Sequence, residues 1–318
     1  MPHSFEMRNI IDPDIAEGTT EFPIPVINDV DEEEVDTRFK YVVANVDDIE
    51  YSLEDLTGCD CEGECVPGSC ACIDASNIEI EDYRIKNASE LHNRFEKYEL
   101  YECGRDICKC KGKCRNRLTP DKFNIKVELV KQKDKGFGVL SKQFIETGTF
   151  VAEFVGELLF VIEANIRQNP SEYSFFVSNL HTFKKNSGHY VDPTRFGNIA
   201  RFFNHSCLPN LTPFRYYSNH RRLDRVSMGF VAWRTIVPGA EITIDYGSKW
   251  WTTNVKQSHN FFCRCEWDYC GYPPPGAPQL TIEESKKKAV QIIKDDLEKL
   301  MLYKKLCRKH LTGTFNLK

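Results

Sequence analysis

The chain has 318 residues, of which 41% are hydrophobic and 28% charged, which is typical of a folded globular protein. Its net charge of −5 argues against a protein that mainly binds nucleic-acid phosphates, and it is compatible with a lysine-rich partner. The sequence contains no run of about 18 apolar residues, so no membrane span is predicted. The N-terminus lacks the pattern of a secretory signal. Fourteen cysteines without such a signal indicate a reducing compartment, the cytosol or the nucleus.

The N-terminal segment, residues 1–21, is predicted to be flexible, because it has little periodicity. Six of the eight residues from 29 to 36 are acidic. One interpretation is a solvated loop; the alternative is a surface that attracts a basic peptide tail.

Nine cysteines then form two short clusters with thirty residues between them. They are Cys59, Cys61, Cys65, Cys70, Cys72, Cys103, Cys108, Cys110 and Cys114. An odd number cannot all pair as disulfides, and two separate four-thiolate zinc sites would leave one cysteine over. Three zinc ions need twelve metal–sulfur bonds, which six terminal and three bridging thiolates supply. The count therefore predicts a trinuclear zinc cluster in a loop-rich segment.

Between the clusters, residues 77–86 are predicted to be a mobile connector and residues 88–99 a short surface helix. From residue 124 onward, short β-rich runs alternate with Gly, Pro and Asn turns, and helices are expected at 162–167 and 197–203. No βαβ alternation is present, which disfavours a doubly wound sheet. The pattern predicts a mainly β fold of several small curved sheets with short helices.

A second zinc site is predicted from four further cysteines. Cys263, Cys265 and Cys270 form a C-x-C-x4-C pattern that lacks a fourth ligand, and Cys207 can complete it across fifty-five intervening residues. A closed four-thiolate site is structural, because it has no open position for water. The alternative for Cys207 alone is a small buried hydrophobic residue.

A proline-rich linker follows Cys270, and residues 281–310 read as a long helix. Thr281 and Glu284 form a capping-box pattern at its start. Val290, Ile293, Leu297 and Leu300 keep a 3–4 spacing along one face. This face is expected to pack on the body of the protein; the alternative is self-association as a coiled coil, whose seam Lys304 would interrupt.

Taken in order, the nine-cysteine region, KGFG (135–138), GNIARFFNHSC (197–207), EITIDYG (241–247) and the C-x-C-x4-C pattern resemble a SET-domain protein lysine methyltransferase. The similarity is greatest to the group that methylates lysine 9 of histone H3, and it covers roughly residues 22–272. It implies a pre-SET zinc region (22–118), a SET catalytic domain with a pseudoknot (119–250), a post-SET zinc segment (251–273), and a linker with a C-terminal helix (274–318).

The resemblance also implies S-adenosylmethionine as cofactor, together with four zinc ions, three in the pre-SET cluster and one in the post-SET site. Alone, the G-x-G of KGFG would usually be a plain hairpin and a lone histidine usually structural. Within the motif set, the cofactor-binding residues implied are Lys135, Gly136, Phe137, Gly138, Tyr173, Arg201, Asn204 and His205.

Tyr246 matches the catalytic tyrosine of the family, with Tyr173 as a second active-site tyrosine. The substrate channel implied by the resemblance is walled by Phe154, Phe175, Ile244 and Trp250. Two of these residues depart from the family pattern. The family usually has Phe or Tyr at the position of Ile244, and it often has Tyr at the position of Phe154.

A missing hydroxyl or a smaller side chain at these positions leaves room for further methyl groups, so a di- or trimethyl product is expected. Ile244 also loosens the aromatic cage, which would reduce activity. No tryptophan soon follows Cys270, and Tyr272 is expected to take its packing role.

The sequence thus predicts a nuclear, chromosome-associated enzyme that acts on the histone H3 tail within chromatin. The alternatives are methylation of another histone or non-histone lysine, or a weakly active chromatin-binding module. Sequence-specific DNA binding is not expected, because no basic recognition helix accompanies the cysteines. No membrane association is expected either, and a protein partner or self-association through the C-terminal helix is left open. Zinc chelation is expected to abolish activity through loss of structure.

Overall fold

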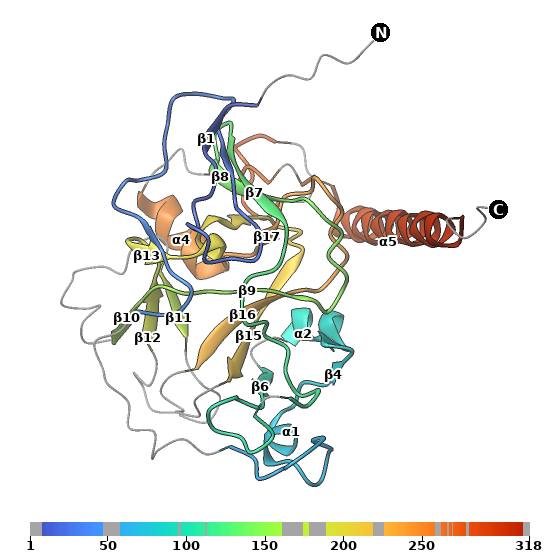
Figure 1. Cartoon of the computed structure of the whole chain (residues 1–318). Helices are drawn as coiled ribbons and strands as arrows, with labels where there is room; N and C mark the ends of the chain where they lie inside the picture. The colour runs from blue at the N-terminus through green and yellow to red at the C-terminus, as the bar shows by residue number, and fades with distance from the viewer. Residues whose placement is uncertain are drawn as a thin grey trace.

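The computed structural model describes residues 8–46, 58–94, 97–111, 113–160, 174–177, 189–218, 226–257, 262–265, 267–268, 270–277 and 280–313. Within these ranges short strands form six small sheets, accompanied by few helices (Figure 1). This confirms the expected mainly β architecture of several small sheets. In the same ranges, no helix combines the length and the apolar composition that a membrane span requires.

One four-stranded sheet joins the N-terminal segment to the glycine-containing hairpin. Its order is β1 (Ile10–Asp12), β2 (Val26–Ile27), β7 (Val127–Gln132) and β8 (Gly136–Ser141). β7 and β8 are antiparallel, and Asp134 (φ 63°) and Gly136 (φ 76°) have left-handed backbone conformations in or beside the turn between them. Glycine adopts that conformation without steric cost. The predicted strand turn at KGFG is therefore present.

The second four-stranded sheet ties the cysteine-rich region to the rest of the chain. Its order is β6 (Glu99–Tyr101), β15 (Leu211–Tyr217), β16 (Ser227–Ala232) and β9 (Phe150–Glu153). All six residues of β16 are buried between its two neighbours. Because β6 leads directly into Cys103, its parallel pairing with β15 anchors the second cysteine cluster to this sheet.

The remaining strands form a three-stranded sheet and three short pairs. They are β10 (Glu157–Phe160), β12 (His189–Asp192) and β11 (Phe175–Val177); β13 (Phe196–Gly197) with β3 (Lys40–Tyr41); β14 (Asn204–His205) with β17 (Thr243–Ile244); and β4 (Ile80–Glu81) with β5 (Arg84–Ile85). The parallel pair β14–β17 joins segments about forty residues apart, a pairing that the expected pseudoknot requires.

The β4–β5 pair corrects the prediction that residues 77–86 are a mobile connector. Ile85 is only 4% exposed, and its backbone N–H donates to the carbonyl of Gly148 at 2.9 Å. The apolar side chains of this segment pack into a buried cluster, and burying them holds the hairpin in place.

The helices are short apart from the last. They are α1 (Ala71–Ala75), α2 (Ala88–Arg94), the 3₁₀ helix η3 (Ile199–Phe202), α4 (Ser248–Gln257) and α5 (Ile282–Gly313). α2 and η3 lie within the predicted helical ranges 88–99 and 197–203. The helix expected at 162–167 lies outside the described residues. α1 and α4 were not predicted.

α5 begins at the predicted capping box but turns a different face to the body. The backbone N–H of Thr281 donates to the Glu284 carboxylate at 2.9 Å, and Thr281 Oγ1 accepts from the Glu284 N–H at 3.3 Å. The buried positions include Asp296 and Leu300, whereas Val290 and Leu297 are about half exposed. The helix, whose far end points away from the body (Figure 1), thus docks on a face that shares Leu300 with the expected apolar seam. This face includes Asp296, which forms an ion pair with Arg234, in place of Val290 and Leu297.

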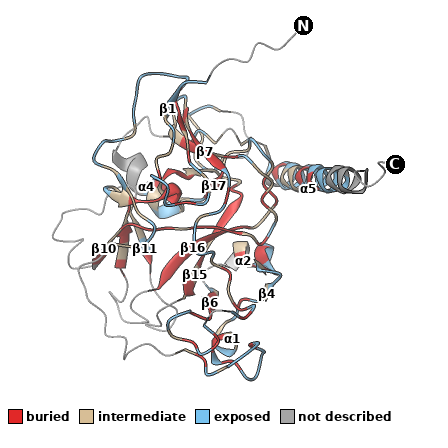
Figure 2. Cartoon of the chain, viewed as in Figure 1, coloured by how far each residue is buried: buried red, intermediate tan, exposed pale blue. Residues whose placement is uncertain are grey.

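Buried residues gather in the two larger sheets and around the cysteines (Figure 2). One apolar core lies along β7, β9, β16 and the η3 segment, and a smaller one lies beneath α2 and the β4–β5 hairpin. The nine clustered cysteines form a third, separate group. The two cysteine-rich segments are therefore packed around sulfur, whereas the segment between them contributes apolar side chains to the smaller core.

Candidate functional site

Three cysteines form the centre of the nine-cysteine cluster. The Sγ atoms of Cys59, Cys65 and Cys103 lie 3.8 Å from one another in each of the three pairs. Each of these residues belongs to two or more of the groups whose sulfur atoms could hold one metal ion. A triangle of shared thiolates is the arrangement that a trinuclear cluster needs for its bridging ligands.

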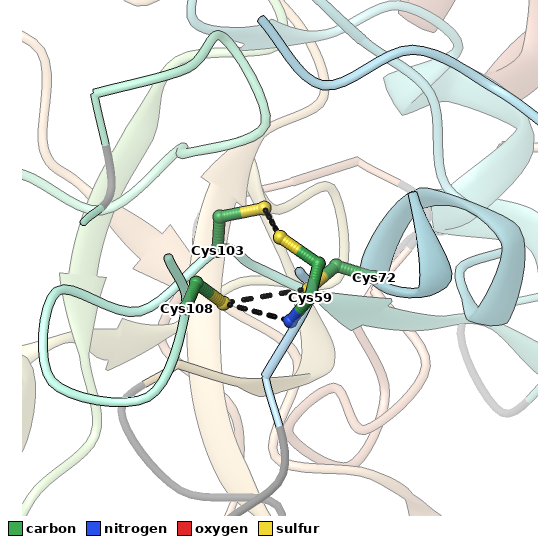
Figure 3. A group of neighbouring side chains, drawn as sticks. All are labelled: Cys59, Cys72, Cys103 and Cys108. Carbon is green, nitrogen blue, oxygen red and sulfur yellow. Dashed lines mark hydrogen bonds between the residues drawn. The ribbon is translucent and has the colours of Figure 1, made fainter. Parts of the chain in front are cut away.

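The other six cysteines surround this triangle. Cys61, Cys70, Cys72, Cys108 and Cys110 each belong to one metal-holding group, and the Cys114 sulfur lies 3.9 Å from that of Cys110. Figure 3 shows one group, Cys59, Cys72, Cys103 and Cys108. Six outer and three shared thiolates match the predicted stoichiometry for three zinc ions.

Polar hydrogens from the protein also point at these sulfur atoms. The Cys59 N–H lies 3.4 Å from the Cys108 sulfur, and Asn116 Nδ2 donates to Cys103 at 3.5 Å. Such donors stabilise thiolate over thiol and hold the ligands in place. The donor set therefore fits zinc.

The four later cysteines also converge. The Cys207 sulfur lies 4.0 Å from that of Cys263 and 3.7 Å from that of Cys270, and Cys265 completes a group within 4.8 Å. The Gly271 N–H donates to Cys207 at 3.3 Å, and the Tyr272 N–H lies 3.4 Å from the Cys270 sulfur. This donor set fits a closed four-thiolate zinc site, as predicted.

The glycine hairpin contacts the start of β14. Asn204 Nδ2 donates to the Phe137 carbonyl at 3.2 Å and to Glu241 Oε1 at 2.9 Å. A Cβ atom at Gly138 would lie 2.8 Å from Asn204 Nδ2 and 2.6 Å from the Glu241 carboxylate, so a larger residue would displace these side-chain ends from their present positions. Lys135 reaches the same carboxylate at 3.5 Å. The structure thus brings four of the predicted cofactor residues together.

Glu241 was missed by the sequence reasoning. It accepts from Asn204 and forms an ion pair with Lys135, so it holds two predicted cofactor residues in place. Its position at the start of EITIDY offers no local signal for this role, because an acidic residue after a Gly-Ala turn is ordinary.

His205 lies between the second cysteine site and Tyr246. Its Nδ1 accepts from the Tyr246 N–H at 3.2 Å, which leaves Nε2 to carry the proton, 3.2 Å from the Cys207 sulfur. Burial lowers the pKa of His205 against the opposing effects of Asp245 and Cys265. Both ring nitrogens have protein neighbours here, so the expected imidazole contact with the cofactor stays a prediction.

Tyr246 is held by its own hydroxyl group. Tyr246 Oη donates to the Phe203 carbonyl at 3.1 Å, and the ring packs edge-on against Trp250 with the centroids 4.6 Å apart. Trp250 packs on Trp251, which stacks on Tyr272 at 4.7 Å. Tyr272 therefore joins the aromatic group around His205. Its expected packing role toward the cofactor stays a prediction, and the buried Trp251 was missed.

The predicted channel walls form an apolar surface next to Tyr246. Phe154 lies edge-on to both Phe175 and Phe230 at 6.1 Å, and Phe203 is 5.7 Å from Phe230. Ile244 is 6% exposed and pairs in register with His205, so the β14–β17 pair brings it beside the motif.

The last two predicted residues are Arg201 and Tyr173. Arg201 is 5.1 Å from the rings of both Phe39 and Phe202, beside the predicted cofactor segment. Tyr173 lies outside the described residues.

The site combines a glycine hairpin, a strand pair between distant segments and two clusters of cysteines that fit zinc. Comparison with known protein families and structures identifies the class of protein with these features. A family model for the SET domain matches residues 136–247, and one for the Pre-SET motif matches residues 16–117. Histone-lysine N-methyltransferase EHMT1 of Mus musculus is 34% identical over 263 residues, covering 81% of this chain and 19% of that protein. The Arabidopsis thaliana enzyme "Histone-lysine N-methyltransferase, H3 lysine-9 specific SUVH3" is 30% identical over 271 residues, covering 75% and 38%.

Among solved structures, Arabidopsis thaliana SUVH6 in complex with SAM matches with a TM-score of 0.69 and 29% identity, covering 85% of this chain and 57% of that one. The chain belongs to the SET-domain family and carries a pre-SET motif before the SET domain. It spans less than two fifths of the length of the two curated relatives above.

Proposed function

We propose that this chain is an S-adenosylmethionine-dependent protein lysine methyltransferase that acts on lysine 9 of histone H3. The observation that carries the proposal is the meeting of Asn204, the glycine hairpin and Tyr246 beside an apolar wall. The names of the relatives support the activity and the substrate, and the SAM complex of SUVH6 supports the cofactor.

The residues present suit methyl transfer to an amine. S-adenosylmethionine, when bound, supplies an electrophilic sulfonium methyl group. A free lysine has a pKa near 10.4, so only about 1 in 10³ is neutral and nucleophilic at pH 7. Phe154, Phe175 and Ile244 offer apolar surface, and desolvation there disfavours the ammonium form of the entering lysine. The lysine must lose a proton to solvent before or during transfer.

Tyr246 has the positioning role in this proposal. Its hydroxyl oxygen is held by the Phe203 carbonyl, and a fixed oxygen can orient the incoming amine toward the methyl group. The aromatic faces of Tyr246 and Trp250 stabilise methylammonium groups by cation–π attraction. The site as proposed needs no metal contact with the substrate, since both thiolate groups are closed.

The direct test is labelled-methyl transfer to a histone H3 tail peptide, with the same peptide carrying alanine in place of lysine 9 as the matched control. Label in the first peptide and none in the second is the expected result. Equal labelling of both would move the activity to another lysine, and the absence of label on any tail of a histone peptide array would favour the alternative of a chromatin-binding module.

The product is expected to be di- or trimethyl-lysine. Phe154 and Ile244 lack the hydroxyl or the bulk that limits amine rotation in the family, so Phe154→Tyr is expected to shift the product toward lower methylation states. Phe176→Tyr is a suitable control, because Phe176 is 42% exposed and neighbours Phe175. Mass spectrometry of the exhausted reaction measures the result; a wild-type protein that stops at monomethyl-lysine contradicts the expectation.

The chain division stays part of this proposal: an N-terminal segment (1–21), a pre-SET region (22–118), a SET domain (119–250), a post-SET segment (251–273), and a linker with a helix (274–318). The expectation that the whole segment 1–21 is flexible is wrong for its described part, because β1 pairs with β2 and Ala16 is fully buried in the main core. We infer that the protein works in the nucleus on chromatin, since its proposed substrate lies there. Absence of sequence-specific DNA recognition also remains a prediction.

Self-association through α5 remains open as well. Val290, Leu297, Met301 and Leu302 are 48–64% exposed on this helix. These exposed apolar side chains support an interface between two copies of α5. A sedimentation coefficient that rises with protein concentration would confirm self-association.

A further inference from the structure

We propose that α5 is a clamp that holds together the two halves of the four-thiolate zinc site, with Asp296 as its main positioning residue. Cys207 comes from the loop after β14, and the other three ligands follow α4, fifty-five residues later. The Gly271 N–H donates directly to Cys207 across the two segments. α5 adds a second link, because it reaches the Cys207 loop through Arg234 and the other segment through Asp268.

The first contact is a buried ion pair. Arg234 Nη1 lies 3.1 Å from the Asp296 carboxylate, and the two side chains are 11% and 12% exposed. The other nitrogens of the same guanidinium group point to the loop that carries Cys207. Nε donates to the Pro209 carbonyl at 3.3 Å and Nη2 to the Leu208 carbonyl at 3.5 Å. One arginine therefore links α5 to the two residues directly after Cys207.

The ion pair is needed because Arg234 is buried. Burial lowers the pKa of Arg234, and Asp296 counteracts this effect. Without the carboxylate, a buried charge is left with only neutral acceptors and the guanidinium group is drawn toward solvent. The Leu208 carbonyl then loses its guanidinium donor, and the Pro209 carbonyl keeps only the Trp233 indole N–H, which donates to it at 3.0 Å.

The second contact reaches the other half of the zinc site. Lys288 forms an ion pair with Asp268, which lies between Cys265 and Cys270, and the Leu280 N–H donates to the Asp268 carbonyl at 3.2 Å. The side chains of this pair are about half exposed, so the pair is weaker than the buried one. Asp296 is therefore the position at which to test the clamp.

Further contacts dock the helix on the SET domain. Leu300 is 5% exposed, Tyr303 packs on Phe144 with the ring centroids 4.8 Å apart, and Lys304 reaches Glu146 at 2.6 Å. The helix is thus held from Lys288 to Lys304, and this part of it has a defined position relative to both zinc-binding loops.

The clamp also connects to the proposed active site through His205. Its Nε2 lies 3.2 Å from the Cys207 sulfur, and its Nδ1 accepts from the Tyr246 backbone. Loosening the Cys207 loop therefore displaces a ring that touches the Tyr246 segment. This kinetic consequence rests on the proposed function; the effect on zinc does not.

The test compares two neighbouring aspartates on the full-length, zinc-loaded protein. Asp296→Asn removes the buried carboxylate, whereas Asp295→Asn makes the same charge change at an exposed position one residue away. Loss of a group that hydrogen-bonds a metal ligand directly weakens metal binding about 10- to 100-fold, and Asp296 acts through Arg234, so we expect zinc binding to weaken by up to about 10-fold. We expect Asp296→Asn to release one zinc per chain to a competing chelator at correspondingly lower chelator concentration, with the pre-SET zinc retained and Asp295→Asn unchanged.

Two further variants complete the experiment. Asp296→Glu keeps the charge and is expected to restore much of the zinc retention. Arg234→Lys keeps the positive charge but loses the planar fork that reaches both carbonyls, so it is expected to behave like Asp296→Asn. If Asp296→Asn does not fold, the Arg234→Lys result decides. In active protein, the KM for S-adenosylmethionine should rise more than kcat falls.

The proposal is overturned if Asp296→Asn and Arg234→Lys keep all their zinc at the chelator concentrations that wild type tolerates. It is also overturned if all zinc ions leave together, which would indicate general unfolding. A protein that transfers no methyl group but still loses one zinc selectively contradicts the proposed function and supports the clamp.

Discussion

Replacement of Tyr246 by phenylalanine is expected to lower kcat for methyl transfer about 100-fold, the cost of a slightly misplaced reacting group. The variant keeps the ring that packs on Trp250 and loses only the hydroxyl group that donates to the Phe203 carbonyl. The site is then still formed, but the oxygen that orients the lysine amine is gone.

The fold should be little affected by this change. One neutral hydrogen bond at a half-buried position contributes about 1 kcal/mol. The melting temperature and the dissociation constant for S-adenosylmethionine should therefore stay close to the wild-type values. Tyr190→Phe, on β12, is the control for loss of a tyrosine hydroxyl elsewhere. Activity of Tyr246→Phe within about twofold of wild type would remove Tyr246 from the proposed mechanism.

Replacement of Cys103 by serine is expected to have the largest effect on stability. Cys103 is fully buried, and its sulfur lies 3.8 Å from those of both Cys59 and Cys65. A shared thiolate contributes to two metal ions, so its loss leaves two sites short of a ligand. Structural zinc contributes about 10–16 kcal/mol in small zinc-dependent folds. We expect loss of the pre-SET zinc ions, unfolding of that region, and loss of activity.

Cys61→Ser is the matched control for this prediction. Cys61 is only partly buried and belongs to a single metal-holding group, so at most one zinc ion should be lost. Metal analysis by mass spectrometry, together with thermal unfolding, measures both variants. Equal zinc content in Cys103→Ser and Cys61→Ser would contradict the distinction between shared and terminal ligands. Chelation of the wild-type protein should reproduce the Cys103→Ser result.

The motif sequences predicted much of the site. The number of the cysteines predicted shared thiolates, because nine thiolates saturate three zinc ions only if three of them bridge, and the structure places three sulfur atoms in a central triangle. The order of the motifs predicted that the KGFG hairpin and Asn204 belong together, and the structure places them within hydrogen-bond distance. These predictions succeeded because ligand count and local turn chemistry are encoded in short segments.

Other features lay beyond local patterns. The sequence of residues 77–86 does not distinguish an irregular connector from a short hairpin. The β4–β5 pairing depends on the packing of Ile85 into an apolar core that distant strands form. Glu241 and Trp251 have ordinary local sequences, and their importance comes only from the residues that fold against them.

The docked face of α5 shows most clearly which features the local sequence predicts and which depend on the tertiary structure. Periodicity alone identified a long amphipathic helix and its capping box, because backbone capping and the 3.6-residue repeat are local properties. It selected Val290 and Leu297 for burial, whereas the structure leaves both about half exposed and buries Asp296. That choice depends on Arg234, sixty-two residues away in the chain. The sequence by itself thus determined the zinc stoichiometry, the motif set and the presence of the helix. Only the tertiary structure decided which strands pair, which charges are buried and which face of α5 docks, since these depend on partners that are distant in sequence.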